Sequence, residues 1–503
     1  MRTAGRRSTI DETESQVSAD GPKASSSLLT GTGVLFAGRV VVAALGWAGQ
    51  ILITRRLTTQ VYGEFSLVFS VLGLLGLVAD FQTSRIVIGE ILEARDDLGG
   101  LVSSFLTFRV ALGALMYAIA VGFVLVAHYP HIVLEATLIG GLSFFIASAT
   151  WALVTVCQAF LWLRTVALSM IVAQAVQFGV TVALFVTHSH AMLHYVVPFV
   201  IYDAVTLVWM LVALNRVVRV RPRVELAHWW HWTKDAAPLA IGATLGTAYF
   251  RIDGVMLSKL GNFSALAVYQ IGYKFSDLLA FAAPALLGAV LPLLIRSWPD
   301  ATADFRKTFR QAFVIFIAFG TFAVVTFAVM CAPAIHLLYE PSYWHAVRPA
   351  RLLVVGQALN LFTELTFVTL VAAGRRGIYP IATLIGFVAN IALNFLFIPL
   401  WSATGAGIAT IVTEVIVLAI LVYGVRDLPI RPLPWRSIGV VALSAGALAL
   451  SLLGMRRVMP WELATVIGML LYGGFLQALR LEGTGLIGFV RESRFGASEA
   501  LPG

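Results

Sequence analysis

Charged residues are scarce in this chain, and that scarcity excludes most classes of protein. Only 12% of the 503 residues are Asp, Glu, Lys or Arg, whereas 59% are hydrophobic; soluble domains are usually about 25% charged. A water-soluble enzyme of two or three globular domains is therefore excluded, and the apolar residues must face lipid. Cysteine is scarcer still. Cys157 and Cys331 both lie in apolar stretches, so no disulfide framework and no cysteine-based metal site is predicted.

Apolar segments long enough to cross a bilayer recur along the whole chain. A spanning helix needs about 20 mostly apolar residues, and the alternating pattern of a membrane β-barrel is absent. The sequence therefore predicts an all-α polytopic membrane protein with about 14 transmembrane helices. The predicted spans are residues 29–53, 62–81, 101–127, 132–156, 165–187, 191–214, 236–258, 268–295, 312–335, 350–373, 379–400, 404–424, 437–454 and 460–479.

Two stretches of the chain are similar enough to indicate a duplication. RRLTTQVYGEFSLVFSVLGLL (55–75) is similar to SKLGNFSALAVYQIGYKFSDLL (258–279), and VIYDAVTL around Asp203 is similar to IVTEVIVL around Glu414. Chance similarity among helices rich in Leu and Val is the alternative. A repeat of six spans predicts two parallel six-helix lobes with the substrate path between them. The predicted boundaries are a disordered cytoplasmic tail at 1–27, lobes at 28–214 and 236–424, a cytoplasmic linker at 215–235, two additional helices at 425–480 and a cytoplasmic tail at 481–503.

Loop charge predicts the orientation of the chain. Of the 35 Lys and Arg residues, four lie well within predicted spans, and the others favour the cytoplasmic side by more than about three to one if both termini are cytoplasmic. The longest connection, 215–235, is too short for a catalytic domain, and there is no Walker phosphate loop. We therefore expect no catalytic residues, no cofactor, no metal site and no enzyme activity.

Four charged residues lie in the hairpin formed by the seventh and eighth predicted spans. A charge near mid-bilayer costs roughly 2.5–3.5 kcal/mol on insertion scales, so each needs a partner, a wet cavity or a function. Arg251, Asp253, Lys274 and Asp277 fall at similar depths on the two spans. We expect Asp253–Lys274 and Arg251–Asp277 contacts, or one shared network. The charges form either a neutral clamp between two helices or a site where Arg251 or Lys274 contacts a passing phosphate.

Two further arginines lie in the inner half of the predicted first lobe. Arg39 and Arg109 each lie about eight residues from the start of a span, and Asp203 is the acid well inside that lobe. The surplus positive charge suits an anionic headgroup, because the guanidinium fork fits phosphate oxygens. Snorkelling of an arginine to the inner surface is the alternative.

The predicted second lobe carries uncharged and acidic candidates. Glu364 and Glu414 are either proton or Na⁺ sites for coupling or protonated structural residues. Asn390 and Asn394 share one helix face, where their amides would contact sugar hydroxyls or bridge to a neighbouring helix; bridging is favoured.

Aromatic and histidine-rich segments of the sequence are interpreted as structural. HWWHW (228–232) is interpreted as an interfacial aromatic belt and not as a nucleic-acid site. Residues 299–313 place Phe305, Phe309 and Phe313 on one stripe, which predicts an amphipathic helix on the membrane surface, or else the continuation of the ninth span. The histidines at 188–194 are interpreted as solvated loop residues.

Several motifs together resemble the multidrug/oligosaccharidyl-lipid/polysaccharide (MOP) exporter superfamily, and within it the bacterial polysaccharide or O-antigen flippases. They are YGEFSLVFS (62–70), YFRIDGVMLSKLGNFSALAVYQIGYKFSDLL (249–279), LVAAGRRG (370–377) and ANIALNFLFIPLWSATGAGIATIVTE (389–414). The turn at 401–404 departs from the commoner pattern, and the acidic residue of the drug exporters' first span is missing.

The resemblance implies a function, a location and partners. It implies a bacterial inner-membrane protein that moves a polyprenyl-pyrophosphate-linked oligosaccharide to the outer leaflet for surface polysaccharide synthesis. A polysaccharide polymerase and other assembly proteins are the implied partners; coupling to H⁺ or Na⁺ is an expectation that comes from the intramembrane acids and not from the resemblance. The alternatives are a small-molecule or drug antiporter of the same superfamily, and a non-transporting membrane scaffold for glycan assembly.

Overall fold

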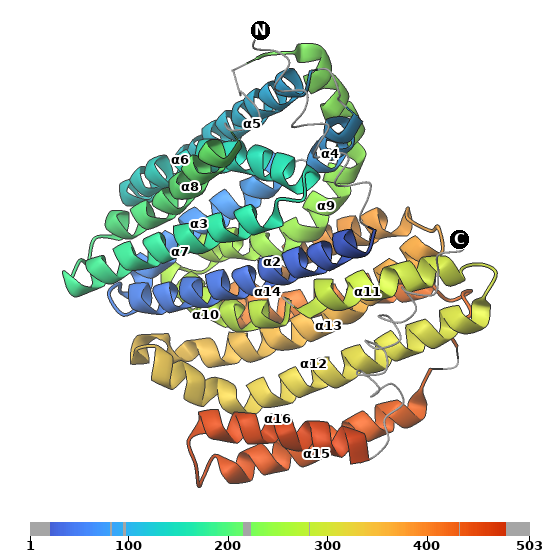
Figure 1. The fold of residues 1–503 in the computed structure, drawn as a ribbon. Helices are drawn as coiled ribbons and strands as arrows, with labels where there is room; N and C mark the ends of the chain where they lie inside the picture. Colours follow the sequence, from blue (N-terminus) through green and yellow to red (C-terminus); the bar gives the residue numbers. More distant parts are fainter. Residues whose placement is uncertain are drawn as a thin grey trace. The chain divides into compact units, whose positions relative to one another are not determined.

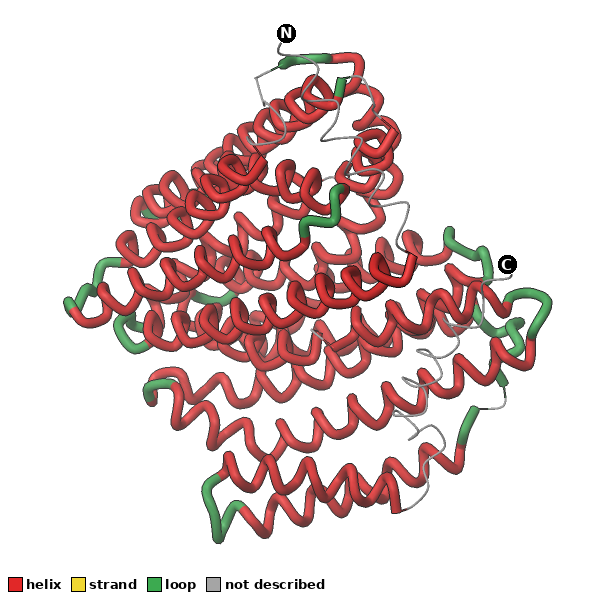
Figure 2. The backbone as a smooth tube through the Cα atoms, in the orientation of Figure 1, coloured by secondary structure: helices red, strands yellow, loops and turns green. Residues whose placement is uncertain are grey.

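The computed structural model describes residues 21–80, 83–93, 97–214, 223–280, 282–431 and 433–478. Within these ranges all the regular secondary structure is helical (Figure 2). The prediction of an all-α protein is confirmed. Backbone polar groups cannot be hydrogen-bonded by lipid, so a chain of this composition satisfies them within helices.

Ten helices of the described residues are long and apolar enough to cross a membrane. The 47-residue helix α14 (Ile378–Gly424) includes two of the predicted spans, 379–400 and 404–424. It bends at Ser402, whose φ of 52° is left-handed, so α14 is two helical arms joined by a tight turn. Gly405 is required there, because a Cβ at this position would collide with the carbonyl oxygen of Phe397.

The chain divides into two compact units. Unit 1 comprises Met1–Arg56 and Leu75–Ala240. In it α5 packs on α6, α6 and α7 pack on α8, and α2 packs on α7. Trp232, with no exposed surface, lies in the core of this unit together with Phe105 and Phe108. The helices are α2 (Gly21–Thr54), α4 (Thr83–Glu93), α5 (Leu98–Val126), α6 (His131–Ala159), α7 (Leu163–Val186), α8 (Met192–Leu214) and the first part of α9 (Leu226–Leu260).

Unit 2 comprises Leu57–Leu74 and Ile241–Gly503. In it α13 packs on α10, α12 and α14, and the pair α15 and α16 packs against α12 (Figure 1). Its helices are the first part of α3 (Thr59–Asp80), the second part of α9, α10 (Phe263–Ala280), α11 (Ala282–Ser297), α12 (Thr302–Leu338), the 3₁₀ helix η1 (Pro341–Ala346), α13 (Val347–Ala372), α14, α15 (Trp435–Met455) and α16 (Trp461–Ala478). The predicted lobes at 28–214 and 236–424 stay a prediction.

Residues 57–74 of the first similar stretch and residues 258–279 of the second contact each other within unit 2. A Cβ at Gly63 of α3 would collide with the carbonyl oxygen of Phe263, so the two chain segments are in direct contact there. Farther along, the Gln270 amide donates to Ser70 Oγ at 3.0 Å. Gly63, the glycine of the YGEF motif, therefore permits this close approach between α3 and α10.

The surface helix predicted at 299–313 is wrong, and the alternative is confirmed. These residues enter α12, which runs without interruption from Thr302 to Leu338. Phe305 and Phe309 are 0% and 5% exposed and pack with residues such as Leu294 and Leu361. Their stripe faces protein, since α11 and α13 supply an apolar surface that makes contact with lipid unnecessary.

Candidate functional site

A carboxylate and four uncharged polar side chains form a buried cluster in unit 2, which we call the Asp253 cluster. Asp253 accepts hydrogen bonds from Tyr269 Oη at 2.6 Å, Asn394 Nδ2 at 2.7 Å and Thr410 Oγ1 at 2.9 Å. Asn394 Nδ2 also donates to Asn390 Oδ1 at 2.9 Å. The three side chains of Asp253, Asn390 and Asn394 have no exposed surface. The cluster thus joins α9, α10 and both arms of α14.

This arrangement follows from the helix periods and the turn in α14. Asn390 and Asn394 are one turn apart and face the same side, and the bend at Ser402 returns the chain so that Thr410 reaches the same carboxylate. The structure therefore brings Asn390 and Asn394 to Asp253 and supports the bridging interpretation of the two amides over sugar contact.

The cluster has the donor set of a small-cation site. Asn394 Oδ1 is a buried oxygen that has no hydrogen-bond partner in the part of the chain that the structure describes. Such a group calls for an explanation, and an ion or a water is one. Carboxylate, hydroxyl and amide oxygens are the ligands of hard cations, so Asp253, Thr410 and Asn394 could hold one.

The two pairwise contacts predicted between the seventh and eighth spans are not formed, whereas the shared network stays a prediction, since Lys274 interacts electrostatically with Asp277 and Arg251. Among the described residues no ion pair joins Asp253 to Lys274 or Arg251 to Asp277; Asp253 is hydrogen-bonded to neutral groups instead. The reason is that α14 covers the face of α9 that carries Asp253. Arg251 is exposed, and Lys274 and Asp277 are partly buried.

The two predicted glutamates differ in their surroundings. Glu414 has no exposed surface and accepts a hydrogen bond from Thr363 Oγ1 at 3.0 Å. Glu364 is partly buried on α13. Both act electrostatically on Tyr379, which places them near the same residue of α14.

In unit 1 the two predicted arginines occupy different environments. Arg39 is exposed on α2, whose main neighbour is α7, whereas Arg109 is 2% exposed on α5, whose main neighbour is α6. Asp203 is partly buried on α8 and has the Ser143 side chain as a hydrogen-bonding neighbour. The structure does not pair Asp203 with either arginine in an ion pair among the residues it describes.

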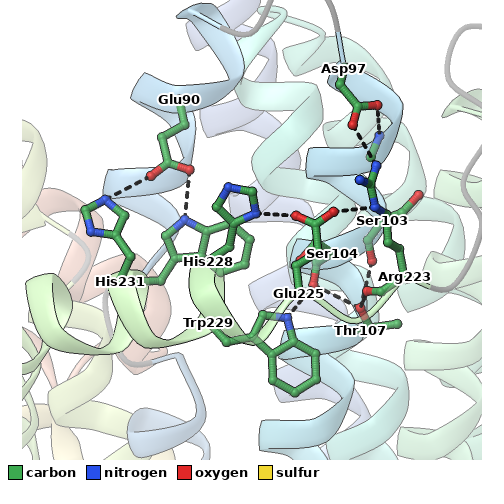
Figure 3. A network of polar contacts seen from close by, with 12 residues as sticks. Glu90, Asp97, Ser103, Ser104, Thr107, Arg223, Glu225, His228, Trp229 and His231 are labelled. Carbon is green, nitrogen blue, oxygen red and sulfur yellow. Dashed lines mark hydrogen bonds and ion pairs between the residues drawn. The ribbon is translucent and has the colours of Figure 1, made fainter.

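A second polar network, absent from the sequence-based candidates, holds the start of α9 against α4 and α5 (Figure 3). Trp232 Nε1 donates to Glu90 Oε2 at 2.8 Å, and His231 Nε2 lies 3.5 Å from Glu90 Oε1. Trp229 Nε1 donates to the Ser104 carbonyl at 3.3 Å. Glu90 on α4 therefore contacts two side chains of the first turns of α9, those of His231 and Trp232.

The residues just before α9 complete this network. Arg223 Nη1 lies 2.6 Å from Asp97 Oδ2, and Glu225 contacts both Arg223 and His228. Asp97 is also the N-cap of α5, where its Oδ1 accepts from the Gly100 N–H at 3.0 Å. The Arg223 guanidinium, and after it this N–H, hold the pKa of Asp97 below its ordinary value of 3.8.

The interpretation of residues 228–232 as a lipid-facing belt is therefore wrong for two of its three tryptophans. Trp232 is fully buried and Trp229 packs against the same core, whereas Trp230 is 71% exposed. Residues three apart share a helix face, and Glu90 accepts the buried indole N–H. An acid at residue 90 and the spacing of the tryptophans were visible in the sequence, but their pairing was not.

Comparison with known proteins supports a transporter fold. The sequence matches the profile of a family described as polysaccharide biosynthesis protein over residues 28–298. No curated protein sequence matches this chain. A lipid II flippase, MurJ, in an inward closed conformation is similar with a TM-score of 0.68 and 12% identity, covering 89% of this chain and 98% of that one.

Two other solved structures share the fold. An inward-facing multidrug resistance MATE family transporter of the MOP superfamily has a TM-score of 0.66 and 13% identity over 77% of this chain and 94% of its own. A MOP superfamily transporter from Pyrococcus furiosus has a TM-score of 0.56 and 14% identity, over 80% and 96%. The protein therefore has the fold of MOP exporters.

Proposed function

Since this chain belongs to the polysaccharide biosynthesis protein family, we propose that it flips a polyprenyl-pyrophosphate-linked oligosaccharide across the bacterial inner membrane. The lipid-linked glycan moves from the cytoplasmic to the outer leaflet, where a polymerase and other assembly proteins build O antigen, exopolysaccharide or capsule. Both termini are cytoplasmic in this proposal. The fold shared with a lipid II flippase supports a substrate that is itself a lipid.

The observation that carries the proposal is the pair of arginines on the membrane helices of unit 1. Arg39 lies on α2 and Arg109 on α5, whereas the carboxylate of Asp203 lies on α8. Guanidinium groups bind phosphate oxygens through parallel hydrogen bonds. In this proposal Arg39, which is exposed, contacts the pyrophosphate first. Arg251 and Lys274 are the further candidates for headgroup contact.

The test is the position of the lipid-linked glycan in cells that carry variants of the two arginines. Arg39→Gln removes an exposed charge, and we expect at least a tenfold fall in transport, about the value of one charge-assisted hydrogen bond. Arg109→Lys keeps the charge but loses the guanidinium fork, and we expect a partial loss. Arg164→Gln, an exposed cation at the start of α7, is the matched control.

Each outcome separates the proposal from its alternatives. Glycan that accumulates on the inner leaflet with Arg39→Gln, at a normal protein level, supports the flippase. Normal transport with both variants contradicts the role of the arginines. No accumulation even when the chain is deleted contradicts the flippase and favours the drug antiporter; a scaffold would tolerate Arg39→Gln.

The proposal includes coupling to H⁺ or Na⁺ at the Asp253 cluster. A buried carboxylate needs a compensating charge or a proton, and among the described residues no cationic side chain forms an ion pair with Asp253. Asp253→Asn should remove the dependence of transport on the ion gradient. Glu364→Gln, on α13, is the parallel variant that tests whether another acid carries the coupling. Transport that keeps its full ion dependence in Asp253→Asn contradicts coupling here and leaves the flippase intact.

A further inference from the structure

Helix η1 forms a fixed support in unit 2, between the end of α12 and the start of α13. Tyr343 of η1 has no exposed surface; its hydroxyl donates to the carbonyl of Leu57 at 2.8 Å, and its ring meets that of Tyr62 edge-on at 5.9 Å. Leu57 precedes α3 and Tyr62 lies in its first turn, within the same unit. These contacts hold η1 against the start of α3.

The next residue, Trp344, points in a different direction. A 3₁₀ helix has about three residues per turn, so consecutive side chains lie about 120° apart, and Trp344 is 41% exposed. Its indole is nevertheless fixed by two contacts. Nε1 donates to the carbonyl of Tyr339 at 3.3 Å, and the ring lies 4.2 Å from the ring of His336, tilted by 31°. The structure thus presents a large aromatic side chain at the surface in one orientation.

Two arginines follow Trp344 along the same stretch of helix. The chain passes from η1 into α13 with Ala346 and Val347 both in the right-handed helical region. Arg348 and Arg351 are three residues apart, so they share a face of α13, and both are exposed. An aromatic ring and two guanidinium groups therefore follow one another at the surface. We call Trp344, Arg348 and Arg351 the Trp344 platform.

This combination of groups suits an oligosaccharide. The face of an aromatic ring carries partial negative charge, whereas the C–H groups of a sugar ring carry partial positive charge, so the two apolar surfaces attract each other. Guanidinium N–H groups donate to sugar hydroxyls and to the carboxylates of acidic sugars. Glu340, the residue before η1, is also exposed and accepts from hydroxyls. A carboxylate beside the platform disfavours a small inorganic anion as the ligand.

A lipid headgroup is the competing ligand, since tryptophan is enriched where membrane helices meet the headgroups. An interfacial tryptophan combines an apolar ring with an N–H that faces the wet side. Trp344 Nε1 instead donates to the Tyr339 carbonyl. The surface of the indole that His336 leaves uncovered therefore favours a ligand that stacks on the ring.

We propose that the Trp344 platform binds the oligosaccharide part of the transported lipid on the outer side of the membrane. This inference rests on the proposed function and adds where the glycan is held. Loop charge predicts that the junction of α12 and α13 lies on the outer side. An aromatic side chain that is already fixed loses little conformational entropy on binding. The platform holds the glycan beside the start of α3 while the lipid leaves the protein.

The test is photo-crosslinking in whole cells, where the probe is the cell's own lipid-linked glycan. The photoreactive residue p-benzoylphenylalanine replaces His345, an exposed residue next to Trp344. After illumination the full-length chain is purified under denaturing conditions, and its covalently bound sugar is measured. The same photoreactive residue in place of Val458, an exposed position between α15 and α16, is the matched control. We expect bound sugar with the label at residue 345 and only background with the label at residue 458.

Variants of the platform, made in the chain labelled at residue 345, show which groups hold the sugar. Trp344→Leu removes the aromatic face and should lower the amount of bound sugar about tenfold. Trp344→Phe keeps an aromatic face and should lower it by no more than about threefold. Arg348→Gln/Arg351→Gln should lower it about fivefold, through lost hydrogen bonds.

The outcomes separate this inference from the proposed function. A large loss of bound sugar in Trp344→Leu and a small one in Trp344→Phe supports stacking on the ring, and equal losses contradict it. Fatty acid instead of sugar on the labelled chain assigns the surface to lipid and overturns the inference. Glycan that reaches the outer leaflet normally, without sugar bound at residue 345, also overturns it and leaves the flippase intact. If glycan reaches the outer leaflet when the chain is deleted, the proposed function fails, and this inference fails with it.

Discussion

Replacing Asn394 with alanine tests how strongly the buried carboxylate of Asp253 depends on its amide donor. Asn394 Nδ2 lies 2.7 Å from Asp253 Oδ1, and neither side chain has exposed surface, so bulk water does not replace the donor. A hydrogen bond to a charged group contributes about 1.5–3 kcal/mol. We expect Asn394→Ala to lower the free energy of unfolding by about 2–3 kcal/mol, which at about 2 °C per kcal/mol lowers Tm by about 4–6 °C.

A double-mutant cycle isolates the contribution of the charge. Asp253→Asn keeps a carbonyl oxygen but removes the negative charge, and a neutral hydrogen bond contributes only about 0.5–1.5 kcal/mol. In that background Asn394→Ala should therefore cost about 1–2 kcal/mol less than in the original chain. Tm and denaturant titration of the detergent-solubilised full-length protein, at fixed Na⁺ concentration, supply the four values.

Thr383→Val is the matched control for this cycle. Thr383 is 1% exposed on the same helix, and its hydroxyl donates to the carbonyls of Tyr379 and Pro380. Its effect should add to that of Asp253→Asn within about 0.5 kcal/mol. If the effects of Asn394→Ala and Asp253→Asn on the free energy of unfolding also add within about 0.5 kcal/mol, the Asn394 amide does not act on the charge of Asp253. That result would refute the prediction.

Three further changes test the local structure. Asp97 has its pKa lowered mainly by Arg223, so the contact stabilises the protein above pH 3.8 and is lost as the pH falls below that value; in Asp97→Asn, Tm should lack this acid-induced fall. Trp232→Ala should cost about 3–5 kcal/mol from the core of unit 1, whereas Trp230→Ala should change Tm by less than about 1 °C. Gly405→Ala should reduce the amount of folded protein in the membrane severalfold, because its Cβ collides with the backbone at the turn of α14.

Each of these expectations has its own control. For Gly405 it is Gly446→Ala on α15, where a Cβ meets no atom within 4 Å and alanine improves helix propensity; equal protein levels in both glycine variants contradict the predicted collision. If the acid-induced fall in Tm is unchanged in Asp97→Asn, other carboxylates cause that fall. Similar costs for the two tryptophan variants contradict the inward orientation of Trp232.

The class of fold and the transport family could be predicted from local features of the sequence. Apolar runs of about 20 residues predict helices because lipid offers no hydrogen bonds to the backbone. The turn at 401–404 is present, and the YGEF and GAGIAT motifs coincide with positions where only glycine permits close packing, at Gly63 and Gly405. These are properties of short stretches, so no tertiary contact was needed to infer them.

The partners of the buried charges were decided only by the tertiary structure. The sequence placed Asp253 and Lys274 at similar depths, but depth does not say which face of α9 meets which neighbour. Asp253 is bonded to residues 16, 141 and 157 positions away, and the choice depends on how α10 and the two arms of α14 pack. The same holds for Trp232 and Glu90, 142 residues apart. Helix period determines which side chains share a face, whereas packing of whole helices determines what that face touches.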